Sequence, residues 1–430
     1  RQRYDEQLLQ ARQEPPFALK VRPSRTTLPC SHEPQMLYVY VGIEKAAGAP
    51  TGGSLNLCLV LDRSTSMQGA RLQHAITAAA GVLSQLRPQD TVSVVAFGDR
   101  AEVLLPPQSG GVNSAALARL RSTVAGGGTE MAQGLAKGLS LVHSSARSDA
   151  AKQILLLTDG HTYGDEERCL QLANEARRSR VAVSAFGLGV DWNEALLDSL
   201  ASRTGGRAFY IRSPERIAES FAIHLSQLAS LVCSDLELAC WLEPNDTLAE
   251  AFLVSPQLFR LPVRGGQPLP LGSVSTQAVT AVLLEICLAS KVCGQQRIGT
   301  LQAKSNPASA GVGARPGAMA VQRVPLRAAF QQPPVPEQAA PDEVQEAAQR
   351  ATLCKLEERV LKHLDRGAHR EASRMLQSLS AQMADLGQGD LAQTSALEAQ
   401  RVAQEGRMSP EGRKLLHYGT RTLLGPHGGK

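Results

Sequence analysis

The sequence predicts an α/β protein built on a doubly wound, mostly parallel sheet, with an antiparallel β-sandwich and a small C-terminal helical bundle attached. Three patterns support this prediction. Between residues 54 and 230, short apolar runs alternate with segments of helical spacing, as in a parallel sheet covered by helices on both faces. Residues 231–330 carry strand-like runs separated by Gly, Pro and Asn turns. Residues 342–424 carry repeated helical spacing.

The alternating region can be assigned element by element. Its strands are predicted at 55–61, 91–97, 101–105, 152–158, 181–187 and 208–211. Its helices are predicted at 72–86, 114–121, 130–143, 166–178, 194–202 and 214–228. The strands at 55–61 and 152–158 are almost entirely apolar, which is typical of strands buried on both faces.

The composition bounds the class of protein. The chain has 430 residues, of which 43% are hydrophobic, and its formal net charge of +5 is spread along its length. The basic run RRSR at 177–180 is short and lies near acidic residues, so we expect no nucleic-acid partner. No apolar stretch reaches about 18 residues, so we expect no membrane-spanning segment. The polar start RQRYDEQLLQARQEPP is unlike a secretory signal, although the sequence begins at Arg.

The eight cysteines are scattered along the chain. Cys58 lies inside an apolar run, and Cys240 and Cys287 lie in strand-like segments. No CxxC pair and no Cys/His cluster with zinc spacing is present. We therefore expect buried, reduced thiols in a cytoplasmic protein rather than a disulfide framework.

Three loops of the alternating region carry oxygen-bearing side chains. Asp62, Ser64 and Ser66 follow the first strand in LNLCLVLDRSTSMQG, Thr129 opens a helix after three glycines, and Asp159 follows the strand at 152–158. Helix capping explains one of the first three side chains, but not the whole set. In open parallel sheets, ligands bind at the carboxyl ends of strands, so we expect these five side chains to meet there.

Hydroxyl and carboxylate oxygens, without His or Cys, suit a hard cation. We predict Mg²⁺, with Mn²⁺ or Ca²⁺ as alternatives, held by the oxygens of these five side chains. With modest charge from the protein, the metal stays electrophilic and can accept a carboxylate from a partner.

The set D-x-S-x-S, a distant Thr in a Gly-rich loop and a later T-D-G resembles the von Willebrand factor A domain over about residues 54–230. In that family these positions form the metal-ion-dependent adhesion site, and all five positions match here: Asp62, Ser64, Ser66, Thr129 and Asp159. The resemblance implies direct and water-mediated metal contacts and a further ligand from an acidic residue of a partner. It also implies that binding can be coupled to a shift of the last helix, here 214–228.

Three neighbouring features have structural explanations. His161 is close enough in sequence to flank the metal, but a surface-loop histidine is the favoured interpretation. The acidic run at 165–167 opens a helix, where acids favour the helix dipole, so we interpret it as capping rather than as a second metal site. Trp192 is either a partner contact or a loop residue packed on its own domain, and the sequence leaves both open.

The remaining segments are divided as follows. We expect the N-terminal segment 1–53, with a strand at 36–44, to contribute strands to the sandwich at 231–330. Sandwich strands are predicted at 236–241, 258–263, 278–288 and 297–303, and a flexible loop at 306–319. A Pro-rich linker at 331–341 precedes a helical bundle at 342–424, with helices at 342–366, 369–386 and 391–404 and a helix start at 409–411, and 425–430 form a tail.

Three functions from different classes follow. We predict first a metal-dependent protein-interaction protein, an adaptor in an intracellular assembly. The stand-alone bacterial members that it resembles often act as adaptors in assemblies, some of them with AAA-type ATPases. The alternatives are a secreted adhesion or inhibitor-like protein, which the layout shared with inter-alpha-trypsin-inhibitor heavy chains suggests, and a metal-dependent hydrolase. We expect no enzyme, because GxxxxGK[ST], GxSxG and HExxH are absent and no general base is evident.

Overall fold

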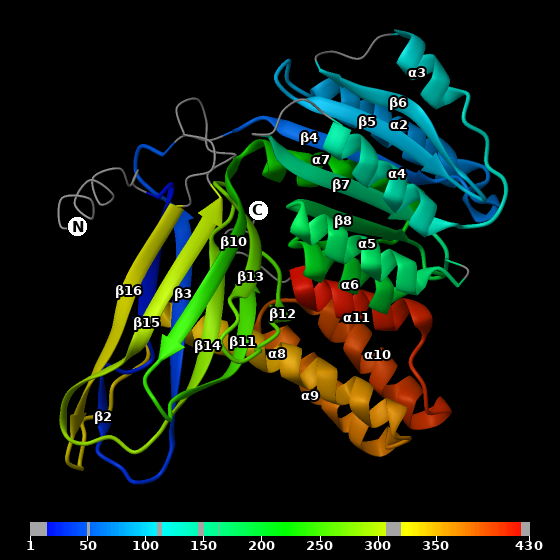
Figure 1. The fold of residues 1–430 in the computed structure, drawn as a ribbon. Coiled ribbons are helices and arrows are strands. Elements are labelled where there is room, and N and C mark those ends of the chain that lie inside the picture. The colour runs from blue at the N-terminus through cyan, green and yellow to red at the C-terminus, as the bar shows by residue number, and fades with distance from the viewer. Residues whose placement is uncertain are drawn as a thin grey trace, which may run out of the picture.

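The computed structural model describes residues 15–49, 52–109, 114–144, 150–162, 164–306 and 320–422. In these residues the strands form one six-stranded sheet and two five-stranded sheets. Figure 1 shows the six-stranded sheet layered between helices, the two smaller sheets beside it, and helices α8–α11 below it. This is the predicted fold class. The predicted tail at 425–430 and residues 307–319 of the predicted loop lie outside the described residues.

The six-stranded sheet has the order β6-β5-β4-β7-β8-β9, and all neighbours are parallel except β5 and β6. Its strands are β4 (Leu55–Asp62), β5 (Thr91–Phe97), β6 (Ala101–Ser109), β7 (Ala151–Thr158), β8 (Val181–Leu188) and β9 (Ala208–Ile211). The central strands β4 and β7 are buried on both faces, which explains their continuous apolar sequences.

Helices cover both faces of this sheet. The helices are η1 (Thr65–Met67), α2 (Ala70–Gln85), α3 (Ser114–Arg121), α4 (Met131–Ser144), α5 (Glu166–Arg178), α6 (Glu194–Thr204), η2 (Pro214–Arg216) and α7 (Ile217–Ala229). The buried side chains of α2, α3 and α7 share one core with the sheet, and those of α4, α5 and α6 share the other. The bounds of α6 have local causes, because the Asn193 side chain accepts a hydrogen bond from the Leu196 amide and Gly205 is left-handed.

The two five-stranded sheets pack face to face around a shared apolar core. Their orders are β1-β3-β14-β11-β12 and β13-β10-β15-β16-β2. The strands are β1 (Phe17–Pro23), β2 (Thr27–Pro29), β3 (Gln35–Lys45), β10 (Leu231–Leu242), β11 (Thr247–Ser255), β12 (Phe259–Arg260), β13 (Leu269–Ser275), β14 (Thr280–Leu288), β15 (Gly294–Asn306) and β16 (Ala320–Gln331). Since β3 pairs with β14, segments on both sides of the six-stranded sheet build one sandwich.

The sandwich differs in detail from the sequence-based prediction. The strand predicted at 258–263 is reduced to the two residues of β12, and Pro262, which has no amide hydrogen to donate, follows shortly after it. Strands β11, β13 and β16 were not predicted. The last two contain Pro or Gly, residues that otherwise mark the turns between strands.

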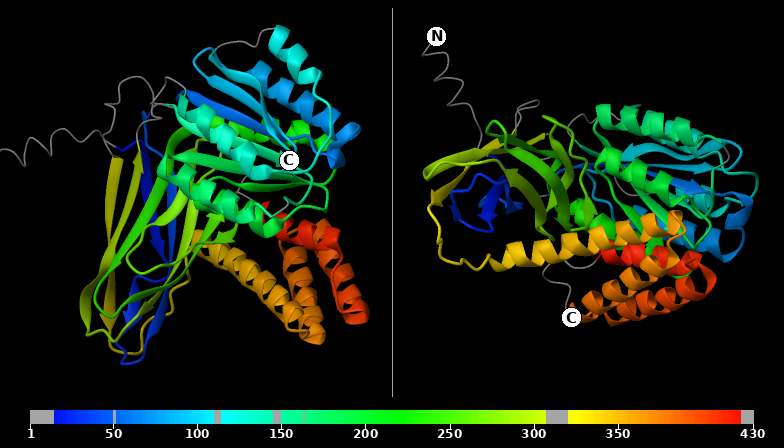
Figure 2. Two further views of the ribbon diagram at one scale, coloured as in Figure 1. Left: turned by 45° about the vertical axis from the view of Figure 1, so that its right-hand side comes forward. Right: turned by 90° about the horizontal axis from the view of Figure 1, so that it is seen from below.

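The C-terminal helices contact both neighbouring parts of the molecule. They are α8 (Asp342–Asp365), α9 (His369–Asp385), α10 (Gly389–Glu405) and α11 (Pro410–Thr422). Side chains of α8 share an apolar cluster with Phe252 and Leu283 on the outer face of a sandwich sheet. In α11, Tyr418 joins the core beneath the six-stranded sheet. Figure 2 shows α8 running beside the sandwich and α11 beneath the six-stranded sheet.

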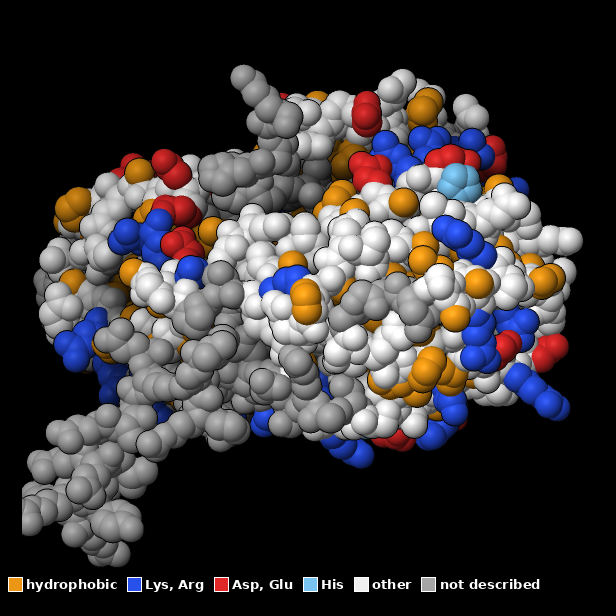
Figure 3. Space-filling model, turned by 90° about the horizontal axis from the view of Figure 1, so that it is seen from above, with side chains coloured by type: hydrophobic (Ala, Val, Ile, Leu, Met, Phe, Trp, Pro, Cys, Tyr) orange, Lys and Arg blue, Asp and Glu red, His pale blue; other side chains and the backbone are white. Residues whose placement is uncertain are grey.

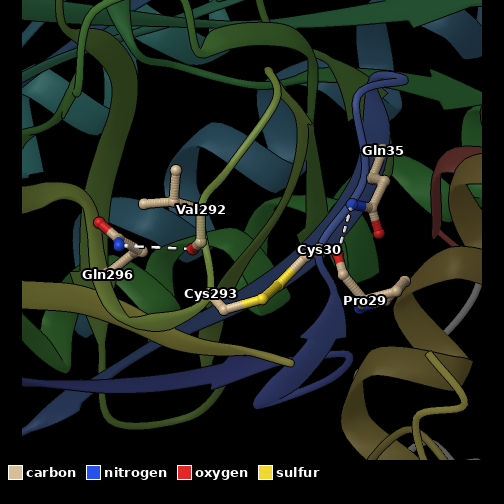
Figure 4. Close-up of a disulfide and its surroundings, with 6 residues drawn as sticks. All are labelled: Pro29, Cys30, Gln35, Val292, Cys293 and Gln296. Carbon is tan, nitrogen blue, oxygen red and sulfur yellow. Dashed lines mark hydrogen bonds between the residues drawn. A yellow bond between two sulfur atoms is a disulfide. The ribbon is translucent and has the colours of Figure 1, made fainter. Parts of the chain in front are cut away.

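The expectation that the cysteines are reduced is wrong for one pair. Cys30 and Cys293 form a disulfide with a Cα–Cα distance of 5.6 Å, and the other six cysteines are free. The bond joins the end of β2 to the loop before β15, and Figure 4 shows the hydrogen bond from Gln35 to the Pro29 carbonyl beside it. Cysteines 263 positions apart carry no local spacing signal that could have revealed this pair.

One face of the surface and the helices bear on the expectations about charge and membrane-spanning segments. On the face shown in Figure 3, basic and acidic side chains lie interspersed. Within the described ranges, no helix combines the length and apolar character needed to cross a membrane.

Candidate metal centre

The predicted ligands lie at the carboxyl edge of the six-stranded sheet. Asp62 ends β4, and Asp159 directly follows β7, which pairs with β4 in parallel. Asp62, Ser64, Thr129 and Asp159 are each at most 4% exposed, whereas Ser66 is exposed. Parallel pairing therefore brings the two carboxylates to one edge, as the sequence predicts.

Both carboxylate oxygens of Asp62 accept hydrogen bonds. The Ser64 amide donates to Oδ1 at 2.8 Å, and the Thr158 hydroxyl donates to Oδ2 at 2.6 Å. The bond from Ser64 turns the chain sharply after β4. Thr158 was not predicted to be part of the site, although it is the Thr of the T-D-G motif and its position at the end of β7 is a usable signal.

A chain of hydrogen bonds links the serines to the second carboxylate. The Ser64 and Ser66 hydroxyls lie 3.0 Å apart, and the Ser66 hydroxyl donates to Asp159 Oδ1 at 2.6 Å. The Arg71 guanidinium donates to Asp159 Oδ2. The structure thus connects the DxSxS loop directly to Asp159, and it adds Arg71, which sequence reasoning missed.

Thr129 arrives from a third loop, and Gly160 marks where the loops converge. A Cβ atom built on Gly160 would lie 3.7 Å from the Ser66 hydroxyl oxygen and 3.9 Å from the Thr129 hydroxyl oxygen. Gly160 therefore faces both hydroxyls, and the space beside it is lined by oxygen atoms. All five predicted residues come together at this edge.

The loop that carries Thr129 is held by residues after β7. The Thr162 hydroxyl donates to the Thr129 carbonyl at 2.8 Å, and the Ala132 amide donates to Asp165 Oδ2 at 2.7 Å. Asp165 stands at the N-cap position of α5, but its side chain makes no cap hydrogen bond there. The acidic run therefore opens α5 as predicted, with Glu166 and Glu167 in its first turn, but the Asp165 side chain makes no cap bond and binds the first turn of α4 instead.

The electrostatics of the edge favour a bound cation. Burial raises the pKa of Asp62 to about 6, the neighbouring Asp159 charge adds to this, and the hydrogen bonds from Ser64 and Thr158 oppose it. Two buried carboxylates this close repel each other, and a positive charge between or beside them relieves that repulsion.

The donor set fits a hard divalent ion. Across the described residues, no group of three or more His, Cys, Asp or Glu side chains could hold a metal ion. A metal at this edge would therefore depend on the hydroxyls of Ser64, Ser66 and Thr129 together with the two carboxylates. Such a set of oxygens suits Mg²⁺ better than a soft metal.

The structure also places His161 and Trp192, the two other residues considered from the sequence. His161 is exposed in the loop after β7, as expected of a surface-loop histidine. Trp192 is 2% exposed, and its ring lies 5.4 Å from that of Tyr418 in α11. Of the two interpretations left open for Trp192, packing on its own domain is found, through Tyr210 of β9, and α11 covers the ring as well.

Comparison with known families assigns two parts of the chain. Residues 56–222 match the model of the von Willebrand factor type A domain. Residues 342–426 match the model described as Sll0103-like, C-terminal alpha-helical domain.

Two curated relatives illustrate the similarity. The chain is 32% identical to the uncharacterized protein sll0103 of Synechocystis over 266 residues, which cover 59% of this chain and 62% of that protein. It is 28% identical to human inter-alpha-trypsin inhibitor heavy chain H4 over 236 residues, covering 51% of this chain and 24% of that protein. The chain thus spans less than two thirds of the length of either relative.

Two solved structures share the fold over nearly the whole chain. A von Willebrand factor type A protein from Catenulispora acidiphila superposes with a TM-score of 0.78 at 18% identity, covering 96% of this chain and 98% of that one. The ArnB paralog VWA2 from Sulfolobus acidocaldarius gives a TM-score of 0.57 at 14% identity, covering 95% and 100%. These likenesses extend to the sandwich and the C-terminal helices, and they concern the fold alone.

Proposed function

We propose that this chain, a von Willebrand factor type A domain protein, binds a protein partner through a divalent metal held at the carboxyl edge of its six-stranded sheet. Domains of this family are typically metal-dependent protein-interaction modules. The observation that carries the proposal is the convergence of Asp62, Ser64, Ser66, Thr129 and Asp159 from three loops beside Gly160.

The roles of the residues follow from their contacts. Asp62 and Asp159 would supply the negative charge, and Ser64, Ser66 and Thr129 would supply neutral oxygens. Thr158 and the Ser64 amide hold the Asp62 carboxylate in place. The metal, once bound, would supply a coordination position for an acidic side chain of the partner. Mg²⁺ is the proposed ion because all the donors are oxygen atoms.

We propose no catalytic role. Each carboxylate oxygen of Asp62 and Asp159 already accepts a hydrogen bond from Ser64, Thr158, Ser66 or Arg71. A metal-dependent hydrolase needs a positioned general base to activate water, and the carboxylates of Asp62 and Asp159 are here the proposed metal ligands.

A secreted, adhesion-type protein is a second candidate, and the Cys30–Cys293 disulfide favours it. Disulfides persist in oxidising compartments and are rare in the cytoplasm. The adaptor role beside an AAA-type ATPase in the cytoplasm stays a prediction, and this bond argues against it. Mass spectrometry of the alkylated protein isolated from its native cells would decide, because a cytoplasmic protein should carry two alkylated thiols at Cys30 and Cys293.

The proposal is tested by metal titration followed by partner capture. Asp62→Ala should abolish binding of Mg²⁺ or Mn²⁺ in a calorimetric titration, while circular dichroism stays unchanged because no apolar core volume is lost. Glu175→Ala is the matched control, since Glu175 is an exposed acid that pairs with Arg168 on α5, away from the five proposed ligands.

The capture step uses the unchanged protein, Asp62→Ala and Glu175→Ala as bait. A partner retained by the unchanged protein and by Glu175→Ala in Mg²⁺, but lost in EDTA and with Asp62→Ala, would support the proposal. Identical metal affinity of the unchanged protein and Asp62→Ala would refute it.

A further inference from the structure

Arg71 contacts two residues of the proposed metal edge, Asp159 and Ser66. It occupies the first turn of α2, and its side chain is 37% exposed, whereas the Asp159 side chain to which it donates is fully buried. The same guanidinium donates to the Ser66 carbonyl at 3.3 Å. A Cβ atom on Gly189, in the loop after β8, would lie 3.9 Å from Arg71 Nη2. The guanidinium thus spans the loops after β4, β7 and β8.

The contacts of Arg71 differ from those of its neighbour Arg63. Arg63 stands between Asp62 and Ser64 in sequence, but it lies 3.7 Å from Glu102 and 3.5 Å from the Val124 carbonyl. Arg71 instead binds one of the two buried carboxylates of the proposed metal site. The two arginines therefore carry the same charge at the same edge, and they differ in whether they touch a proposed ligand.

The contact of Arg71 with Asp159 matters because the Asp159 carboxylate is buried. Asp159 Oδ1 is held by Ser66, Oδ2 is held by Arg71, and Asp62 ends the neighbouring parallel strand β4. A buried carboxylate beside a second acid requires a compensating positive charge. Arg71 provides that charge from within the chain.

We propose that Arg71 is an internal counter-ion that competes with the divalent metal for Asp159 and thereby sets the metal affinity of this edge. This inference rests on the proposed function. A guanidinium and a divalent cation repel each other over a few ångströms in a poorly solvated site. Metal binding must therefore either displace Arg71 from Asp159 or proceed against its charge. Both routes weaken metal binding, and both disappear when the guanidinium is removed.

The test compares Mn²⁺ affinity in the full chain by isothermal titration calorimetry. Arg71→Gln removes the charge and should tighten the Kd at least about tenfold. Arg71→Met, which keeps an unbranched side chain without the charge, should do the same and guards against a folding defect of the first variant. Arg63→Gln removes the same charge at the same edge without freeing Asp159, and it should change the Kd by less than about threefold.

A second readout separates competition from a structural role. In EDTA, Arg71→Gln should unfold at a lower temperature than the unchanged protein, because two buried carboxylates lose their counter-ion. Saturating Mn²⁺ should then raise its unfolding temperature by more than it raises that of the unchanged protein, through the tighter binding.

The outcomes separate this inference from the function on which it rests. Tighter binding in both Arg71 variants but not in Arg63→Gln supports it. Equal or weaker binding in the Arg71 variants overturns it and leaves the metal-binding proposal intact. Absence of binding in every variant, including the unchanged protein, overturns both.

Discussion

The ammonium of Lys414 donates a hydrogen bond to the backbone carbonyl of Trp192 at 2.9 Å and lies 3.5 Å from the centre of the Trp192 ring. Lys414 belongs to α11, and Trp192 belongs to the loop after β8, at the same edge of the sheet as the proposed metal site. The C-terminal helices thereby contact the edge of the six-stranded sheet at which the proposed metal site lies.

We expect Lys414→Ala to destabilise this contact. Lys414 is 3% exposed, and its replacement leaves the Trp192 carbonyl without its donor. The free energy of unfolding should therefore fall by about 2 kcal/mol. Urea unfolding followed by tryptophan fluorescence in a Trp241→Phe background would measure it, because Trp192 is then the remaining tryptophan. Lys362→Ala, which removes an exposed lysine of α8, should have little effect. A loss below about 0.5 kcal/mol for Lys414→Ala would show that the contact contributes little.

His417 predicts a pH dependence of stability. Its ring bonds Asp198 at 2.9 Å and also Glu357, with Tyr418 and Arg421 facing the same Asp198 carboxylate. Burial alone would lower the pKa of His417, but the two carboxylates outweigh it and raise the pKa to about 9 from an ordinary 6.5. The folded state therefore binds the proton more tightly than the unfolded state. Its contribution is complete below pH 6.5 and is lost as the pH rises from 6.5 to 9.

The measurement is the difference in unfolding temperature between the unchanged protein and His417→Gln from pH 6 to pH 10. That difference should shrink as the pH rises. The comparison is needed because Lys414, whose pKa burial lowers to about 8, contributes with the opposite sign as the pH rises from about 8. A difference that stays constant over this range would contradict the assignment.

The disulfide predicts sensitivity to reductant. Reduction of Cys30–Cys293 frees a segment whose ends are 263 positions apart, and removal of such a bond typically costs about 2–4 kcal/mol. Dithiothreitol should lower the unfolding temperature of the unchanged protein. It should not lower that of the double variant Cys30→Ser/Cys293→Ser, which should start from the lower value. If the unchanged protein and the double variant unfold at the same temperature without dithiothreitol, the disulfide does not stabilise the fold.

Gly160 predicts a graded effect on metal binding. An alanine Cβ would make ordinary contacts with Ser66 and Thr129, at 3.7 and 3.9 Å. Gly160→Ala should therefore keep most of the metal affinity. The branched side chain of Gly160→Val would enter the space among the hydroxyls and should weaken Mn²⁺ binding at least about tenfold, by crowding a close-packed site. Equal affinities for the two variants, measured by calorimetry, would place the metal elsewhere.

Local pattern alone determined the alternating part of the molecule. Apolar runs predict buried strands such as β4 and β7, and apolar residues at helical spacing predict the helices between them. Both signals arise between residues close in sequence. The same logic placed Asp62 and Asp159 at one edge, since parallel strands must present their carboxyl ends together. The five candidate ligands could therefore be named before any coordinates, although their role as metal ligands stays a prediction.

The tertiary structure decided what depends on distant segments. The pairing of β3 with β14 and the bond between Cys30 and Cys293 join positions separated by the whole of the six-stranded sheet and its helices. The sequence pattern predicts an ordinary charged residue in the first turn of a helix at Arg71. It predicts a charged residue on a helix surface at Lys414. In the folded chain each donates a hydrogen bond to an acceptor on another loop: Arg71 to the Asp159 carboxylate and Lys414 to the Trp192 carbonyl. Such contacts are set by how the elements pack, and no local periodicity encodes them.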